Sequence, residues 1–227
     1  MQRKENPVLK LVFLGPPGAG KGTQAARMAA EFALEHASTG EIFRKAAAAG
    51  SELGQTVRSY LDAGRLVPDE LTSRIVLEVV LDRVRDYILD GYPRTLPQAQ
   101  ALDRMLQERG EALDGVLCFE LPVEEAVRRL TGRLVCTGCG ANYHRLFMPP
   151  RRDDVCDKCG AGLVARTDSS EKVVRTRLAE YAAKTEPLVP YYEHRGLLRR
   201  VDASLDPDSV SESIRRVLRT LCEGSRH

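Results

Sequence analysis

Residues 15–23 read Gly-Pro-Pro-Gly-Ala-Gly-Lys-Gly-Thr and contain the residue types that bind phosphate groups. Glycines let the backbone turn and point successive N–H groups at an anion, and a following helix N-terminus adds positive potential. Lys21 can reach terminal phosphates, although Gly22 stands where the strict P-loop pattern has Ser or Thr. A glycine-rich turn that binds nothing is the alternative, but the apolar run before the loop and the helical pattern after it favour a phosphate site. Its expected residues are Gly18, Ala19, Gly20, Lys21, Gly22 and Thr23.

Four of the six cysteines form two C-x-x-C pairs, Cys136 with Cys139 and Cys156 with Cys159, with residues 140–155 between the pairs. This spacing is typical of zinc ribbons, in which four thiolates hold one tetrahedral ion. Four cysteines leave no open coordination position, so we expect a structural rather than a catalytic Zn²⁺. Iron or cobalt would also suit these ligands, and two disulfides or a redox dithiol are the alternatives.

The other cysteines and histidines carry no comparable pattern. Cys118 lies in an apolar run and is expected in the core. His144 lies near the cysteine pairs and is a fifth ligand or a surface residue, of which we expect the surface residue. His36 has no chemistry-bearing constellation around it in the sequence, and Cys222 has no C-x-x-C partner.

The composition excludes several classes of protein. The chain has 227 residues, of which 43% are hydrophobic and 29% charged, and 34 Lys+Arg against 32 Asp+Glu give a net charge of +2. This balance gives no bulk electrostatic reason to expect a nucleic acid or a membrane surface as partner. The polar opening and the absence of a long apolar run predict a cytoplasmic protein.

The elements that would position these residues alternate along the chain. Strands are expected at residues 8–14, 87–90, 115–120 and 197–201, and helices at 21–32, 70–84, 97–109, 123–130, 170–184 and 207–221. This alternation predicts an α/β fold with a parallel sheet flanked by helices. Residues 38–68 are expected to hold short helices. Residues 132–170 show no helical periodicity and are too long for a structureless loop. We therefore expect the bound metal to stabilise the fold of this segment.

Further motifs follow in order: Ser38-Thr39-Gly40, Arg44, Gly-Arg-Leu-Val at 64–67, Asp-Gly-Tyr-Pro-Arg at 90–94, and Gln98. Together with the phosphate loop, these residues resemble the adenylate kinases among the nucleoside monophosphate kinases. The long-lid bacterial type that binds zinc is the more similar form, and the resemblance covers residues 8–221. It implies a P-loop NTPase-like fold and the reversible, Mg²⁺-dependent reaction ATP + AMP = 2 ADP, which maintains adenine nucleotide balance.

The resemblance also implies roles for individual residues, and phosphoryl transfer needs such fixed cations because its transition state spreads negative charge over several oxygens. The implied catalytic residues are Lys21, Asp90, Arg94, Arg133, Arg166 and Arg177. Besides the phosphate loop, the implied ATP-binding residues are Arg129, Arg133, Asn142, Tyr143 and Leu205. The implied AMP-binding residues are Thr39, Arg44, Arg65, Leu66, Val67, Gly91, Tyr92, Pro93, Arg94, Gln98, Arg166 and Arg177.

Three of these roles are more specific. Asp90 matches the acidic residue that orients water on Mg²⁺, Gln98 is expected at the adenine edge of AMP, and the contact at Leu205 would come from the backbone.

Three positions depart from the family pattern. Glu41 replaces the usual Asp after Ser-Thr-Gly and puts the Mg²⁺ geometry in question. Ser169 replaces the second residue of an Asp-Asp pair, and Tyr92 replaces a common Phe, which we expect to be neutral.

The resemblance divides the chain into a core at 1–37, 68–132 and 171–227, an AMP-binding insertion at 38–67 and a zinc-binding lid at 133–170. We expect a monomer that uses ATP, AMP and ADP and binds neither nucleic acid nor membrane. The nearest alternative is a kinase for UMP or CMP, or one that uses GTP as donor. A zinc ribbon that binds nucleic acid or a protein is less favoured, because aromatic residues make up only 5% of the chain.

Overall fold

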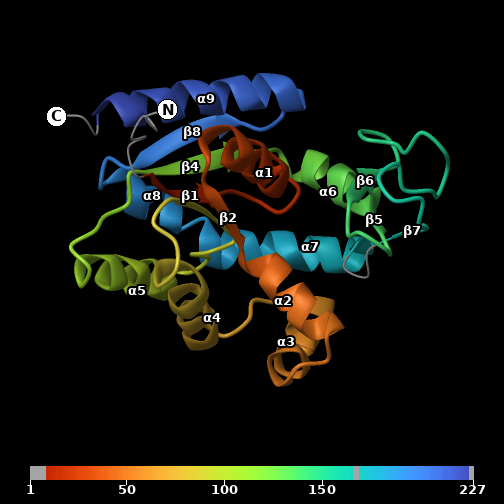
Figure 1. The fold of residues 1–227 in the computed structure, drawn as a ribbon, viewed down its shortest axis with the longest axis horizontal. Coiled ribbons are helices and arrows are strands. Elements are labelled where there is room, and N and C mark those ends of the chain that lie inside the picture. Colours follow the sequence, from red (N-terminus) through yellow and green to blue (C-terminus); the bar gives the residue numbers. More distant parts are fainter. Residues whose placement is uncertain (1–8, 166–168, 225–227) are drawn as a thin grey trace, which may run out of the picture.

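The computed structural model describes residues 9–165 and 169–224, which form a five-stranded parallel sheet with helices on both faces (Figure 1). The strand order is β2-β3-β1-β4-β8. The strands are β1 (Lys10–Leu14), β2 (Glu35–Ser38), β3 (Tyr87–Asp90), β4 (Gly115–Glu120) and β8 (Leu198–Asp202). This arrangement confirms the predicted fold class.

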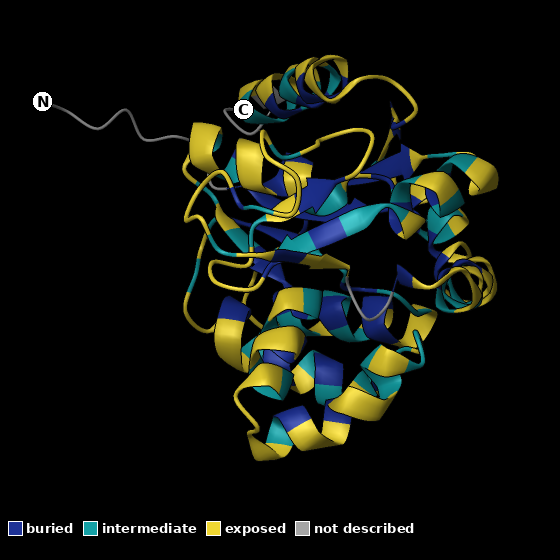
Figure 2. Ribbon diagram, turned by 90° about the vertical axis from the view of Figure 1, so that its right-hand side faces the viewer, coloured by how far each residue is buried: buried dark blue, intermediate teal, exposed yellow. Residues whose placement is uncertain are grey.

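Alternate residues of the central strands face opposite layers of helices, as the two-residue period of a strand requires. Leu11 and Phe13 pack with α1 (Lys21–Phe32) and α9 (Pro207–Gly224). Val12 and Leu14 belong to a second cluster with α4 (Asp69–Val76), α5 (Leu96–Gln107) and α8 (Leu188–Glu193). Figure 2 shows the central strands in the buried colour and exposed residues on the outer helices. Among the described helices, none is long and apolar enough to cross a membrane.

Most predicted elements are present, with a few differences. The helix expected at 21–32 has those bounds, and the strands expected at 87–90 and 115–120 are β3 and β4. The helix expected at 70–84 is α4 followed by a π-helical segment, η1 (Leu77–Leu81). The helix expected at 170–184 is α7 (Glu171–Glu180) followed by a second π-helical segment, η3 (Tyr181–Thr185). The sequence did not predict β2 or α8.

The region at 38–68 folds into two helices, α2 (Thr39–Ala48) and α3 (Glu52–Asp62), as expected. The two helices meet closely, because a Cβ atom at Gly54 would lie 2.0 Å from the carbonyl oxygen of Ala46. Phe43, Val57, Val67 and Ile75 form a small core for this region. It projects from the carboxyl ends of β2 and β3 below the large sheet in Figure 1.

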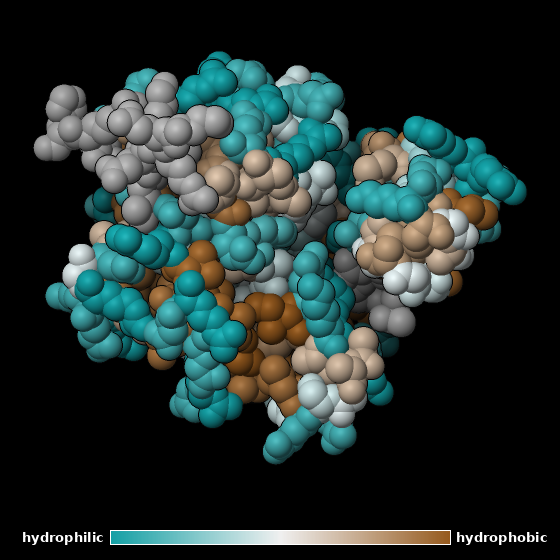
Figure 3. All heavy atoms as spheres, in the orientation of Figure 1, coloured by the Kyte–Doolittle hydropathy of each residue, from teal (hydrophilic) through white to brown (hydrophobic). Residues whose placement is uncertain are grey.

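The helix α6 (Val123–Thr131) leads into residues 133–165, which we call the lid. This segment carries a separate antiparallel sheet. Its strands are β5 (Arg133–Cys136), β6 (Asn142–His144) and β7 (Leu163–Ala165), in the order β6-β5-β7. In the space-filling view the lid stands to the right of the core, with a hollow between them (Figure 3). As predicted, the described residues of this segment form no helix, although the sequence did not predict these strands.

Candidate active site and metal centre

The phosphate loop lies between the end of β1 and the start of α1. Gly20 occupies the N-cap position of α1 with φ of 80°, a left-handed conformation that glycine adopts without strain. Among the described residues no side chain caps this helix, and its first turn contains no acidic residue. The helix N-terminus therefore retains its positive potential, which suits an anionic group at the loop.

Lys21, the first residue of α1, reaches back across this loop. Its Nζ donates hydrogen bonds to the carbonyl oxygens of Gly15 and Pro16, at 2.7 and 2.9 Å. Burial lowers the pKa of Lys21 from 10.5 to about 8, against the opposing effect of Asp90. The ammonium group is thus held in the loop and poorly hydrated, which strengthens its attraction to phosphate.

Asp90 ends β3 directly beside the loop, where a Cβ atom at Gly22 would lie 3.2 Å from its Oδ2. The same oxygen is 3.4 Å from Nε2 of His36, on the neighbouring strand β2. Burial raises the pKa of Asp90, but the hydrogen bond with His36 and the charge of Lys21 outweigh burial and hold it below its usual value. Asp90 is therefore a carboxylate. The expectation that no chemistry-bearing constellation surrounds His36 is wrong, since His36 lies beside Asp90.

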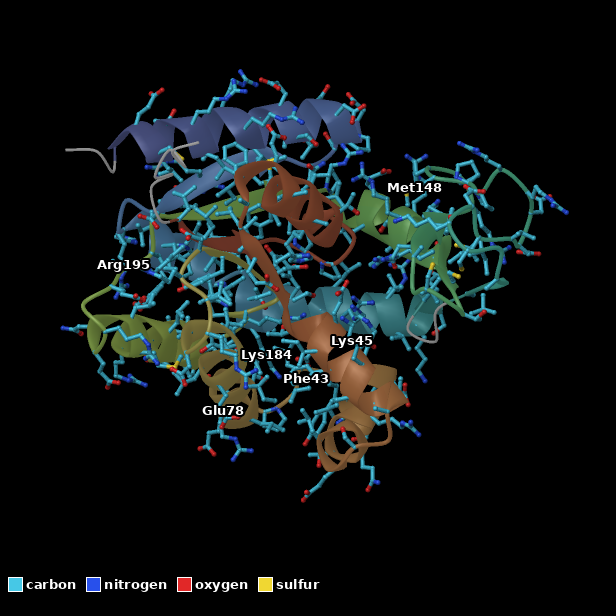
Figure 4. All side chains as sticks on the ribbon, viewed as in Figure 1. Phe43, Lys45, Glu78, Met148, Lys184 and Arg195 are labelled. Atoms are coloured by element: carbon cyan, nitrogen blue, oxygen red, sulfur yellow. The ribbon has the colours of Figure 1, made fainter. Side chains whose placement is uncertain are left out.

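Cations from several elements converge on Lys21. The positive charges of Arg94, on the loop after β3, of Arg177, on α7, and of Arg133, on the first lid strand, each lower the pKa of Lys21. In Figure 4, Phe43 and Lys45 mark α2 and Met148 marks the lid, and nitrogen-bearing side chains gather between α1, α2 and α7. Of the six predicted catalytic residues, Lys21, Asp90 and Arg94 lie close together beside the phosphate loop, and the charges of Arg133 and Arg177 act on Lys21. The sixth, Arg166, lies outside the described residues.

Arg94 is half-buried next to Gly91 and Thr39. Its Nε donates to the Gly91 carbonyl oxygen at 2.7 Å, and Thr39 Oγ1 donates to the same oxygen at 2.9 Å. Gly91 has a φ of 84°, a left-handed conformation that favours glycine, and a Cβ atom there would lie 2.6 Å from Arg94 Nη2. Burial lowers the pKa of the Arg94 guanidinium, and the nearby charge of Asp90 opposes this effect.

Gln98 lies in the same neighbourhood, but its side chain already has two protein partners. Its Oε1 accepts from the Arg94 backbone N–H at 2.7 Å, and its Nε2 donates to Asp69 Oδ1 at 2.7 Å. Thr95 Oγ1 donates to the other oxygen of Asp69 at 2.7 Å. Gln98 therefore fixes the backbone of Arg94 in this structure, and a contact with a nucleobase stays a prediction.

The other predicted AMP-binding residues border the insertion. The guanidinium of Arg44 lies over Gly40, where a Cβ atom would be 3.1 Å from Nη1. A Cβ atom at Gly64 would lie 2.8 Å from Arg177 Cγ, so the loop after α3 packs against α7. Of the remaining residues, Val67, Tyr92 and Pro93 are buried, Leu66 is half-buried and Arg65 is exposed.

The predicted ATP-binding residues outside the loop lie on α6, the lid and the turn after β8. Arg129 is held by Glu125 Oε1 at 2.8 Å and by the carbonyl oxygen of Ala203 at 2.8 Å. Leu205 follows in that turn and is 45% exposed. In the lid, Asn142 is exposed and Tyr143 is buried.

The four predicted metal ligands form one cluster in the lid. Their sulfur atoms lie within 4.8 Å of one another, and the cysteines are free, not disulfide-bonded. Cys136 Sγ is 3.4 Å from Cys159 Sγ, and Cys139 Sγ is 3.6 Å from Cys156 Sγ. A tetrahedral zinc ion with Zn–S bonds of about 2.3 Å needs sulfur atoms about 3.8 Å apart, so this donor set fits such an ion.

His144 is buried, so the interpretation as a surface residue is wrong. Its Nδ1 accepts hydrogen bonds from the backbone N–H groups of Leu146 and Phe147, at 2.9 and 3.1 Å. Its ring fills the space beside Gly132, where a Cβ atom would lie 2.5 Å from the ring. Nor does it join the metal cluster, which contains the four cysteines among the described residues. Cys118 is buried in the core as predicted.

A strand, a glycine loop and a helix that begins with lysine, faced by arginines and by a lid with four cysteines, define a P-loop phosphotransferase. The family model described as adenylate kinase matches residues 13–197. The chain belongs to the adenylate kinase family and is a nucleoside monophosphate kinase.

Curated relatives agree over nearly the whole chain. An adenylate kinase from Anaeromyxobacter sp. is 48% identical over 210 residues, which cover 92% of this chain and 98% of the relative. One from Archaeoglobus fulgidus is 46% identical, with 92% and 98% covered. One from Lachnospira eligens is 44% identical, with 92% and 100% covered.

Proposed function

We propose that the chain catalyses ATP + AMP = 2 ADP with Lys21, Arg94, Arg133 and Arg177 as the cations that stabilise the transferring phosphoryl group. The observation that carries this proposal is the placement of Lys21 in the phosphate loop beside Asp90, where the charges of three arginines from separate parts of the chain act on it. Arg166 is proposed to join them. Family membership supports the reaction itself.

Phosphoryl transfer requires that the two nucleotides and the cations be held in position, more than it requires acid–base catalysis. The AMP phosphate is already an anionic nucleophile, so no side chain needs to act as a strong base. The transition state places negative charge on the equatorial oxygens of the transferred group, and fixed cations stabilise that charge without reorganising. Lys21 and the N-terminus of α1 would hold the ATP phosphates, while Arg94 and Arg44 would hold the AMP phosphate.

Asp90 is the residue that fits magnesium. Its carboxylate lies beside the phosphate loop, and its pKa below the usual value keeps it ionised. Magnesium prefers oxygen ligands and retains several waters, which a carboxylate can orient. When bound with ATP, the ion would neutralise phosphate charge. Glu41 lies exposed in the first turn of α2, where its longer side chain could serve the same water shell.

We assign the four cysteines to a structural Zn²⁺ that folds the lid. The donor set is complete, with four thiolates and no open position, so the metal would supply stability and not catalysis. Binding of zinc to such sites contributes about 10–16 kcal/mol in small zinc-finger peptides.

The boundaries 38–67 for the AMP-binding insertion and 133–170 for the lid remain our proposal. The lid has a small apolar core of its own, whereas the apolar cluster of the insertion also includes Ile75 of α4. Both would close on their nucleotides and exclude the water that would otherwise hydrolyse ATP. Since one chain carries all the proposed residues, we propose a monomer, and the free cysteines suit the reducing cytoplasm.

The substitution Arg94→Ala tests this assignment. We expect kcat/KM for AMP to fall at least about 100-fold, because the cation proposed to hold the AMP phosphate is lost. Binding of MgATP should change much less. Arg104→Ala on α5 is the matched control and should retain normal turnover. An Arg94→Ala variant with a near-normal kcat/KM for AMP would remove Arg94 from the AMP site.

A further inference from the structure

The side chain of Tyr143 contacts the metal cluster. Its Oη lies 3.5 Å from the sulfur of Cys156. The same oxygen accepts a hydrogen bond of 2.8 Å from the backbone N–H of Asp157, the next residue of that C-x-x-C turn. Tyr143 is 8% exposed and packs in the small lid core with Leu134 and Leu163.

These two contacts fix the direction of the hydrogen bond to sulfur. The Asp157 N–H group donates to the Tyr143 oxygen, so the hydroxyl proton is available for another acceptor. A cysteine that binds a metal is a thiolate and has no proton to give. The Tyr143 O–H group therefore donates to the Cys156 sulfur, and a single side chain holds both the backbone and the ligand atom of this turn.

The two cysteine pairs differ in this respect. Cys136 Sγ accepts backbone N–H groups from Gly138 and Cys139, each at 3.4 Å. Such N–H donors belong to the turn itself and require no particular side chain. Cys156 additionally faces a hydroxyl from β6, a strand outside its own turn. Hydrogen bonds to ligand sulfur reduce the repulsion among four thiolates and orient the ligand, as outer-shell partners do in other metal sites.

We propose that Tyr143 is a positioning residue for the metal centre, donating a hydrogen bond to the Cys156 thiolate and holding the second cysteine turn onto the lid sheet. The inference rests on the proposed metal-binding function of the lid. It also links the metal to the active site, because Tyr143 pairs with Leu134 on β5 next to the pair of Arg133 with His144. Retention of the metal would thus fix the strand that presents Arg133 to the phosphates.

The test compares zinc release from the full-length, zinc-loaded chain and its Tyr143→Phe variant, in excess of a chelating dye whose absorbance reports the ion. Phenylalanine keeps the ring in the lid core and removes only the hydroxyl. We expect the variant to release zinc about 10–100 times faster than the wild type. With cobalt in place of zinc, its sulfur-to-metal charge-transfer band should shift to lower energy, since the sulfur loses a hydrogen bond.

Two control variants distinguish the loss of the Tyr143 hydroxyl from the general effect of removing a hydroxyl elsewhere in the protein. Thr137→Val removes another lid hydroxyl, which donates to the Gly162 carbonyl oxygen at 3.0 Å and touches no sulfur. Tyr192→Phe makes the same chemical change at a buried core tyrosine whose hydroxyl has no hydrogen-bond partner among the described residues. Both should release zinc at the wild-type rate, within about twofold. Equal release rates for Tyr143→Phe and the wild type would overturn the proposal.

A further variant decides the outcome if Tyr143→Phe does not load with zinc at all. Leu134→Ala removes the buried side chain that pairs with Tyr143 but keeps the hydroxyl. Loading and slow release by Leu134→Ala would assign the loss to the hydroxyl, whereas failure of both variants to load would assign it to packing and overturn the proposal. A wild-type chain that holds no metal would instead refute the metal-binding lid itself.

Discussion

The large sheet and the lid sheet differ in what holds them together. Helices cover both faces of the large sheet, and side chains such as Leu117 and Phe119 on β4 are fully buried. In the described part of the lid, the buried apolar cluster has five residues, two of which are cysteines of the metal cluster. Leu146, by contrast, is 71% exposed.

The core and the lid therefore differ in the source of their folding free energy. Burial of apolar surface stabilises the core without any ligand, whereas a small segment with so little core needs a metal or a partner. The proposed active site uses both regions, since Lys21 belongs to the core and Arg133 to the lid. Changes in the core site should therefore reduce activity without lowering stability, whereas loss of the metal should lower both.

The largest effect is expected from Lys21→Met. Turnover should fall at least about a thousandfold, because the variant removes the cation at the centre of the site. The melting temperature should stay the same or rise, since burial of the ammonium group is unfavourable. Kinetics and thermal unfolding measure the two effects separately.

Lys184→Met is the control for this variant, because Lys184 is an exposed surface lysine paired with Glu180 and is labelled in Figure 4. It should behave as the wild type. A Lys21→Met enzyme that keeps a tenth of normal turnover would contradict the role of Lys21.

Removal of the metal should have the next largest effect. Chelation should lower the melting temperature and unfold the lid while leaving the core folded, since the proposed zinc ion would supply most of the lid's stability. Hydrogen exchange would show this directly: amides at 133–136 and 142–144 should lose protection, and those at 10–14 and 115–120 should keep it. Unchanged melting and exchange in a metal-stripped sample would show that the lid folds without metal.

The smallest expected effect, and the one most specific to the core, is the dependence of kcat/KM on pH. With a pKa of about 8, Lys21 is charged below that pH and loses its charge above it. The value of kcat/KM for MgATP, which reports the free enzyme, should therefore fall as pH rises through about 8, by up to about tenfold per unit. A profile that stays flat to about pH 9.5 would mean that Lys21 remains charged.

The lowered pKa of Lys21 also makes the free energy of unfolding depend on pH. Because the folded pKa lies below the usual 10.5, the unfolded state binds more protons between these values. This group alone therefore makes folding more favourable as pH rises from about 8 to 10.5, while activity falls. Lys21→Met should remove both trends.

Local motifs allowed much of this structure to be predicted. The phosphate loop, α1, β3 and β4 each depend on contiguous residues with a clear period or a glycine signal. The four cysteines were also predictable, because C-x-x-C spacing is itself a local signal for metal binding.

Features that depend on the folded chain were not predictable. β2 is a polar edge strand, Glu-His-Ala-Ser, with only two buried residues and no alternating pattern. α8 contains Pro190, which argues against a helix in sequence alone. The contact of His36 with Asp90 joins residues 54 positions apart. His144 is buried because Gly132 leaves room for its ring, which no local pattern indicates.

We propose that the core site and a metal-stabilised lid act together to transfer a phosphoryl group from ATP to AMP. The most direct test measures ADP formation from MgATP with AMP, CMP, UMP or GMP as acceptor, using metal-loaded and chelated protein in parallel. We predict strong turnover with AMP alone, reduced when the metal is removed. Equal turnover with a pyrimidine monophosphate, or none with any acceptor, would contradict the account.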